Sequence, residues 1–129
     1  MQSVHLTWPG GYNAFRLRIG ELRALQNATN AGPEELLNRI RVGKWRVDDL
    51  IQVLRWGLVG ADEMSAADAA TVVTPLLDLH PLSEFRIAAS AVLLAALVGV
   101  DDDPVGETVG VAETPPENGS SLSSMPQEP

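Results

Sequence analysis

Two short runs near the start of the chain alternate between apolar and polar side chains. The runs cover residues 4–8 and 15–19, and a Pro-Gly-Gly sequence at 9–11 separates them. A period of two is typical of a strand with one buried face, and a Gly-rich break between two such runs is typical of a turn. The pattern predicts an N-terminal β-hairpin that packs on the helices after it, because an isolated hairpin is only marginally stable.

From Ile19 onward, the apolar residues recur every three or four positions, which predicts several α-helices. The first begins at Ile19 and ends at an αL residue, either Asn30 or Gly32. The second covers residues 33–42, with a proline in its first turn and a glycine after its end. The third covers residues 46–59 and has the clearest apolar stripe, at Val47, Leu50, Ile51, Leu54 and Leu58, with Gly57 and Gly60 marking its end.

The last two predicted helices lie beyond residue 64. Ser65 and Asp68 resemble a capping pair that opens the fourth helix, and Pro75 predicts a kink or break near Thr74. The fifth helix is apolar nearly all round from 87 to 98. Because a membrane span needs about 20 residues and this run is shorter, it predicts a central core helix. The bulky members of the predicted core are Trp8, Trp45, Trp56 and Phe85.

The acidic charge of the chain is concentrated at its C-terminal end. The 129 residues include 17 acidic and 9 basic side chains, and seven of the acidic ones lie in residues 100–129, which contain no Lys or Arg. Residues 1–99 therefore carry a charge of only −1, from 9 basic and 10 acidic side chains. We predict that 100–129 form a disordered acidic tail rich in Pro and Ser. Residues 1–99 are predicted to form one small α+β domain, mostly α, in which the hairpin packs on about five helices.

Residues that would carry catalysis or hold a metal are absent or isolated. The chain has no Cys, which removes disulfides, thiolate zinc sites and cysteine nucleophiles. His5 and His80 are not spaced as metal ligands. Asp48 and Asp49 are adjacent on a predicted helix, so their side chains point about 100° apart, and acidic residues are favoured at a helix N-terminus in any case. The sequence predicts a protein that is not an enzyme, with no catalytic residue, cofactor or metal site.

Eight of the nine basic residues lie between positions 16 and 55. The predicted helices at 33–42 and 46–59, joined by a Gly-containing turn, also loosely resemble helix-turn-helix DNA readers. Asp48 and Asp49 would open the recognition helix and face the phosphates, so nucleic-acid binding is not expected. A helix-turn-helix-like DNA-binding protein stays as an alternative, beside a basic face that docks a protein and a basic face that is merely solvated.

Several segments resemble a known protein family. They are Phe15–Leu25 (FRLRIGELRAL), Ala31–Leu37 (AGPEELL), Lys44–Asp49 (KWRVDD) and Arg55–Gly60 (RWGLVG). These segments resemble the small tail assembly chaperones of gene transfer agents and siphophage-like prophages, a family also labelled tail tube protein, and the resemblance covers about residues 13–99.

The resemblance implies a non-catalytic factor of tail morphogenesis. Such chaperones coat the long, apolar, helical tape-measure protein before the tail tube polymerises around it. The expected partners are the tape-measure protein and other tail assembly proteins, with homo-oligomers formed through exposed hairpin edges as a further option and no membrane contact. The expected location is the cytoplasm of the bacterial host cell, with association to the particle as an option. The alternative is a structural tail tube component retained in the particle, which generally needs a larger sheet than one hairpin.

The tryptophans and the basic residues around position 42 are the candidate partner-binding residues. The hypothesis is that they mark the surface for the client or for self-association, while the alternative for each tryptophan is plain core packing. The candidate residues are Trp8, Arg39, Arg41, Lys44, Trp45, Arg46 and Trp56.

Overall fold

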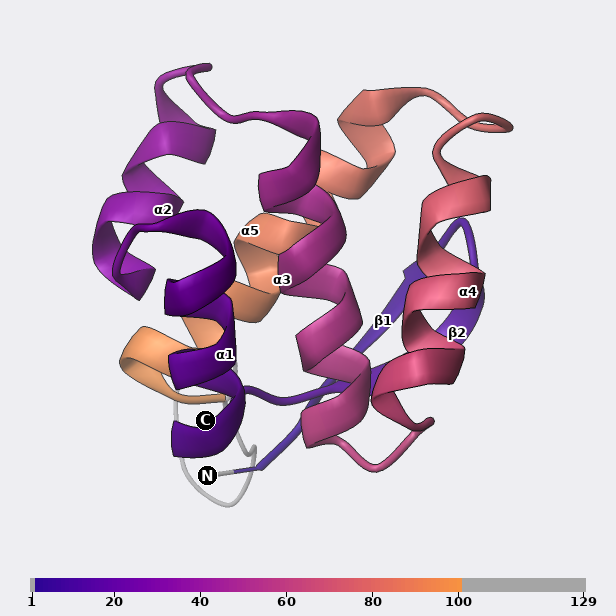
Figure 1. Cartoon of the computed structure of the whole chain (residues 1–129), viewed down its shortest axis with the longest axis horizontal. Coiled ribbons are helices and arrows are strands. Elements are labelled where there is room, and N and C mark those ends of the chain that lie inside the picture. The colour runs from indigo at the N-terminus through magenta and orange to yellow at the C-terminus, as the bar shows by residue number, and fades with distance from the viewer. Residues whose placement is uncertain (1, 101–129) are drawn as a thin grey trace, which may run out of the picture.

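A computed structural model describes residues 2–100, so the predicted tail lies outside the described residues except for Val100. Strands β1 (Val4–Trp8) and β2 (Gly11–Phe15) form a two-stranded antiparallel sheet. The helices that follow are α1 (Ile19–Thr29), α2 (Pro33–Arg41), α3 (Val47–Gly60), α4 (Ala66–Leu76) and α5 (Leu82–Val98), as Figure 1 shows. This architecture confirms the predicted hairpin followed by five helices.

The hairpin turns more tightly than its sequence pattern indicates. Trp8 is paired with Gly11, so the loop consists of only two residues, and the pairing ends at Val4 opposite Phe15. Gly11 has a φ of 119°, a left-handed conformation that favours glycine after such a turn. The two-residue loop fixes the register and makes β2 begin at Gly11.

The prediction of a second strand at 15–19 was therefore wrong. After β2, the backbone N–H of Arg16 donates to the carbonyl of Gly57 at 2.9 Å, which draws the chain away from the sheet and onto α3. Leu17 is buried in the core, whereas Ile19 is 67% exposed at the start of α1. The apolar alternation at these positions therefore does not come from a strand, because Leu17 is buried in the core while Ile19 lies exposed at the start of α1.

The outer edge of β2 is covered by a carboxylate. Glu63 accepts hydrogen bonds from the side-chain amide of Asn13 (2.9 Å) and from the backbone N–H of Ala14 (3.2 Å), and Trp8 donates its indole N–H to Asn13 at 2.7 Å. These bonds to the ionised form lower the pKa of Glu63, with the Asn13 amide as the larger cause. The backbone N–H of Ala14 is thus already used, which works against strand addition at this point of the edge.

Glu63→Gln is expected to lower stability at neutral pH more than at acidic pH. Because the folded-state pKa is depressed, the stabilisation by Glu63 is present above its unfolded pKa of about 4.3 and is lost as the pH falls through the folded value. The gap in urea midpoint between wild type and Glu63→Gln should therefore be larger at pH 7 than at about pH 3. An equal gap at both pH values would show that the ionised carboxylate has no such role.

Helix α3 is the centre of the packing. It contacts α1, α4, α5 and β2, and Figure 1 shows it between α1 and α4 with α5 behind. Leu50, Leu54 and Leu58 of its predicted stripe are fully buried, although Val47 at the helix start is 46% exposed. Gly57 lies inside the helix, not at its end as predicted. A glycine suits this position because the ring of Phe15 packs directly against it and leaves little room for a side chain.

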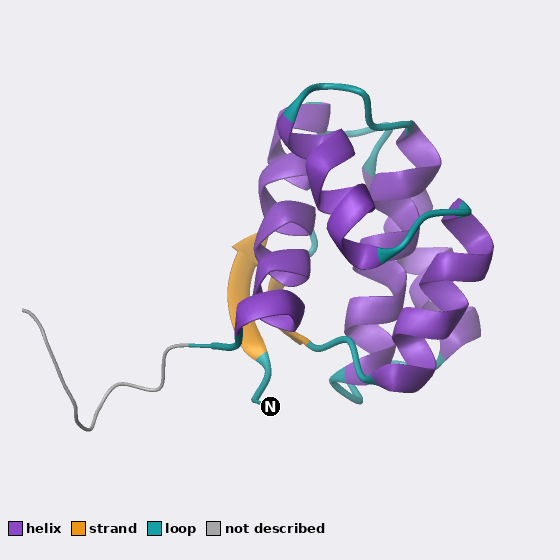
Figure 2. Ribbon diagram, turned by 90° about the vertical axis from the view of Figure 1, so that its left-hand side faces the viewer, coloured by secondary structure: helices purple, strands orange, loops and turns teal. Residues whose placement is uncertain are grey.

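The prediction that α5 is a central core helix was wrong. One face of α5 is buried against α2, α3 and β1, but Ile87, Leu94, Leu97 and Val98 are 66%, 42%, 37% and 74% exposed. In Figure 2, α5 lies in front of the orange hairpin, at the outside of the molecule. An apolar sequence all round a helix does not require neighbours all round it, since each helix lies where the chain connections place it.

The predicted helix caps are largely confirmed. Asn30 ends α1 in the αL conformation with a φ of 56°, and the Ser65 hydroxyl opens α4 by accepting from the backbone N–H of Asp68 at 3.1 Å. Helix α4 includes Pro75 in its last turn and ends at Leu76, two residues later than the break expected near Thr74. Within residues 2–100, no helix is both long and apolar enough to cross a membrane.

The aromatic core is centred on phenylalanines. Phe15 and Phe85 are fully buried, and the ring of Trp8 lies edge-on to both, with ring centroids 5.4 and 6.4 Å away. Trp45 and Trp56, predicted as core members, are only partly buried at the margin of the core. The bulky centre of the core is therefore the hairpin–α5 contact.

Candidate partner-binding surfaces

A buried carboxylate organises the corner between α2 and α3. Asp49 has no exposed surface and accepts a hydrogen bond from the backbone N–H of Arg46 at 2.8 Å, as in an N-terminal helix cap. The guanidinium groups of Arg39 and Arg46 approach the same carboxylate at 3.2 and 3.3 Å. Asp49 is thus fully paired, and this pairing explains why a charged group is tolerated in the core.

The same two arginines also bind the end of α1. Arg39 and Arg46 donate to the backbone carbonyl of Thr29 at 3.4 and 3.0 Å. Cationic groups are favoured at the carbonyl end of a helix, where the backbone acceptors lack partners within the helix. The Arg39–Arg46–Asp49 cluster therefore ties α1, α2 and α3 together.

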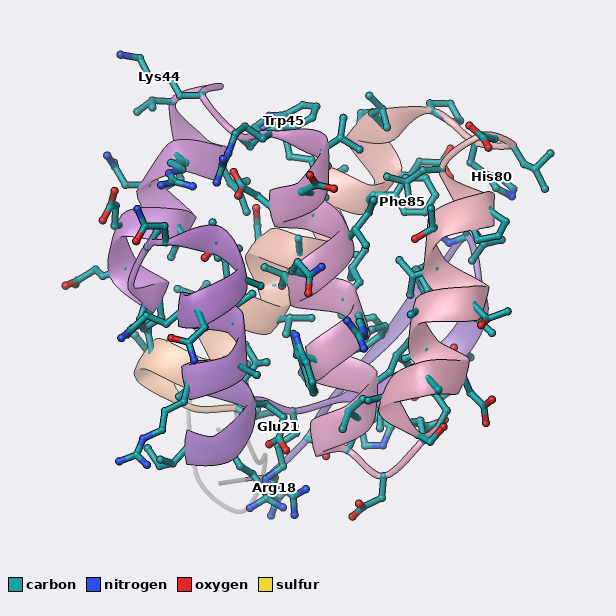
Figure 3. All side chains as sticks on the ribbon, in the orientation of Figure 1. Arg18, Glu21, Lys44, Trp45, His80 and Phe85 are labelled. Carbon is teal, nitrogen blue, oxygen red and sulfur yellow. The ribbon has the colours of Figure 1, made fainter. Side chains whose placement is uncertain are left out.

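Five of the seven candidate residues share this corner, but their side chains differ in solvent exposure. Arg39 is mostly covered, whereas the side chain of Arg46 is 62% exposed beside its contact with Asp49. Arg41 and Lys44 are exposed, and Trp45 is half-buried. Figure 3 shows Lys44 extending away from the ribbon at the same end of the molecule as Trp45.

The other two candidates, Trp8 and Trp56, do not belong to this corner. Trp8 is only 6% exposed and packs under the hairpin. Trp56 lies on α3, where its indole N–H donates to Gln52 at 3.1 Å and the guanidinium of Arg55 covers its ring at 4.8 Å. The seven residues thus do not form one continuous surface.

The structure gives little support to a helix-turn-helix DNA reader. Seven residues of α3 are buried, and the helix contacts four other elements. A recognition helix contacts DNA through side chains near its N-terminus, whereas the exposed side chain there includes the acidic Asp48. Asp49, expected to face the phosphates, points into the core instead, while Asp48 is exposed.

An apolar surface that the sequence interpretation missed lies on α5. No charged residue occurs from Ile87 to Val98, and the outward side chains of this stretch include Leu94 and Leu97. The signal in the sequence is the uncharged stretch itself, which fits a helix with one outward apolar face as well as it fits a core helix. Exposed apolar groups that gather on one helix mark interaction sites more often than isolated ones do.

A hollow of about 410 Å³ runs between α2 and this side of α5. We call it the α2–α5 groove. Its apolar lining comes from Leu37 on α2 and from Leu94, Leu97 and Val98 on α5. The polar residues of the lining all lie on α2 and are Glu34, Asn38 and Arg41. Arg41, a candidate residue of the α2–α3 corner, is thus also part of this groove.

The histidines take part in aromatic packing. His5 stacks on Tyr12 with ring centroids 6.0 Å apart, and His80 lies 6.3 Å from the ring of Phe85. Among the residues that the structure describes, no three His, Cys, Asp or Glu side chains gather as metal ligands would. The surface features that stand out among the described residues are the exposed apolar side chains of α5 and the exposed basic residues of the α2–α3 corner, which are typical of a binding or assembly protein.

The comparison with known families agrees with this class of protein. Residues 2–99 match the family described as phage tail tube protein, GTA-gp10. The chain belongs to this family, which confirms the resemblance found in the sequence and extends it to the first strand. The family consists of non-catalytic tail assembly and tail tube proteins that interact with other tail proteins, in agreement with the prediction of a non-enzyme. No curated protein and no solved structure matches the chain.

Proposed function

We propose that the protein is a tail assembly chaperone that binds the tape-measure protein of a gene transfer agent or prophage while the tail forms. The proposal places its action in the cytoplasm of the bacterial host cell. The observation that carries it is the α2–α5 groove, whose α5 side leaves the apolar Leu94, Leu97 and Val98 exposed and whose α2 side is mostly polar. A groove with one apolar and one polar side suits an amphipathic partner, and the family supplies the context of tail assembly.

The shape and lining of the groove suit an amphipathic helix. Its length is limited by α2, whose 9 residues span about 14 Å, so three or four apolar side chains of a client helix would fit along it. Leu37 and Leu97 provide the apolar walls, and Arg41 at the rim can pair with an acidic residue on the polar side of the client. So small a contact favours weak binding, which a chaperone that must release its client requires.

The main alternative is a tail tube subunit that stays in the particle. A ring wall generally needs an extended sheet, whereas residues 2–100 contain one two-stranded sheet whose β2 edge is partly covered by Glu63. This difference favours the chaperone. Mass spectrometry of purified particles separates the two functions, because a stoichiometric amount in mature tails would contradict a transient role.

Leu97→Glu is expected to weaken binding of a helical tape-measure fragment at least tenfold. The substitution places a charge on the apolar α5 wall of the groove, where binding of the client would remove it from water. The matched control is Val72→Glu on α4, because Leu97 and Val72 are 37% and 39% exposed and both lie on helices. Fluorescence anisotropy with a labelled fragment measures both, and equal affinities for the two variants would contradict the groove.

The α2–α3 corner is tested by a separate variant. Lys44→Glu and Trp45→Ala change the corner without removing a ligand of Asp49, whereas Arg46→Glu would disturb the fold. If the client binds the groove, Lys44→Glu should leave its affinity within about twofold of wild type. Loss of binding in Lys44→Glu and Trp45→Ala, with Leu97→Glu unaffected, would move the client site from the groove to the corner.

A further inference from the structure

Four residues of α5 form a stripe, of which only Leu94 and Val98 also line the α2–α5 groove. Ile87, Ala91, Leu94 and Val98 follow one another at intervals of four, three and four residues. This is the spacing of the apolar seam along which two helices pack in a coiled coil. We call the stripe the α5 crest.

Three of the four crest residues are exposed. Ile87 and Val98 at its two ends are 66% and 74% exposed, Leu94 is 42% exposed, and Ala91 is half-buried. On the side of the hairpin, two hollows border the crest. One lies between Ile87 and Trp8, and the other lies between Leu94 and Val4. The crest forms a ridge and the hollows form grooves beside it, which is the kind of surface on which another helix packs.

We infer that the α5 crest binds the α5 crest of a second copy of this chain, with the two helices antiparallel. A twofold axis brings the same patch of both copies together, so a stripe that is apolar and uncharged from 87 to 98 meets an identical stripe. With the axis midway between Ala91 and Leu94, Ile87 lies opposite Val98 of the other copy. The small Ala91 then faces the larger Leu94, which lets the two helices interlock.

The charge of the C-terminal residues selects the antiparallel orientation. Residues 101–129 contain seven acidic side chains and no basic ones, and the chain enters them directly after α5. Parallel helices would bring both acidic segments to the same end of the pair, where they repel each other. In the antiparallel pair they leave at opposite ends, separated by roughly the 25 Å length of α5.

The pairing is expected to be reversible and to compete in part with client binding, because Leu94 and Val98 also line the α2–α5 groove. The crest spans 12 residues, or about 17 Å, and so short a seam buries less surface than a permanent dimer needs. Leu97 lies about 80° round the helix from Ile87, on the side of α2, but Leu94 and Val98 belong to both the crest and the groove, so pairing of two copies covers part of the groove wall. The inference does not depend on the proposed function, because its test needs no client.

Sedimentation velocity of the full chain over a wide concentration range is the primary test. The chain should change from monomer to dimer as its concentration rises, and Ile87→Glu should weaken the dimer at least tenfold. The matched control is Ile19→Glu on α1, because the two isoleucines are 66% and 67% exposed. A monomer at every concentration, or an equal effect of both substitutions, would overturn the inference.

Cysteine variants test the orientation cleanly because the chain has no Cys of its own. A mixture of Ile87→Cys and Val98→Cys chains should form a mixed disulfide on oxidation, whereas neither variant alone should cross-link efficiently. In parallel helices each variant would cross-link with itself, and that result would overturn the antiparallel arrangement.

The same variants show what covers the crest. The thiol of Ile87→Cys should react with a thiol-specific reagent rapidly in dilute solution and more slowly as the chain concentration rises. Slow reaction at every concentration would mean that residues 101–129 of the same chain cover the crest, and rapid reaction at every concentration would mean that nothing does. Either result would overturn the pairing of two copies.

Discussion

Asp49→Ala is expected to lower the free energy of unfolding by about 3 kcal/mol or more, the cost of breaking a buried ion pair by removing one partner. The carboxylate is completely buried and binds the backbone N–H of Arg46 together with the guanidinium groups of Arg39 and Arg46. Its loss removes the cap of α3 and leaves two cations at Thr29 without their common counter-ion. Urea unfolding followed by circular dichroism measures the change.

The neighbouring acid provides the control for Asp49→Ala. Asp48 lies in the same first turn of α3 and interacts favourably with the helix dipole in the same way, but its side chain is exposed. Asp48→Ala should therefore cost no more than about 0.5 kcal/mol. If the two alanine variants unfold at the same urea concentration, the buried cluster does not hold the three helices together, and its arginines become available for partners.

This cluster also explains why charged residues near position 42 are poor probes of binding unless they are chosen from the structure. Arg39 and Arg46 stabilise the α2–α3 corner, so reversing either charge would alter the fold and mimic a loss of binding. Lys44 is exposed, and among residues 2–100 it has no ion pair within 4 Å. Lys44 is therefore the residue that reports on the corner alone.

The local elements were predictable where a single short-range rule decides the structure. Asn30 takes the αL conformation and Ser65 caps α4 because each needs only its neighbours in the chain. The second strand was misplaced because its register follows from the two-residue loop, whereas beyond Phe15 the chain is drawn onto α3 by the hydrogen bond from Arg16 to Gly57, and Leu17 is buried in the core. The periodicity of apolar residues indicates which side chains tend to be buried, but it does not show which other element buries them.

The candidate site was less predictable than the fold for the same reason. An acidic residue in the first turn of a helix is favoured in any sequence, so nothing local shows that Asp49 turns inward while Asp48 turns outward. The apolar stretch after Ile87 likewise fits a central helix and an outer helix equally well. The choice between them depends on α3 occupying the centre, which is a property of the whole chain.

Gly60→Ala is expected to destabilise the protein by about 3 kcal/mol, although alanine is the better helix former. Gly60 is the last residue of α3, and a Cβ atom there would lie only 1.8 Å from the backbone carbonyl oxygen of Arg16. A backbone atom cannot turn aside as a flexible side chain can. The segment after β2, held to α3 by the hydrogen bond from Arg16 to Gly57, would have to move as a whole.

Gly20→Ala is the control, since Gly20 lies in the first turn of α1 and a Cβ atom there would meet nothing within 4 Å. That variant should unfold at an equal or higher urea concentration than wild type, with a gain of up to about 0.5 kcal/mol. The close approach at Gly60 fixes the hairpin on the end of the central helix, so Gly60→Ala should also shift the near-ultraviolet signal of Trp8. A Gly60→Ala protein as stable as Gly20→Ala would show that the hairpin can be held at a greater distance from α3.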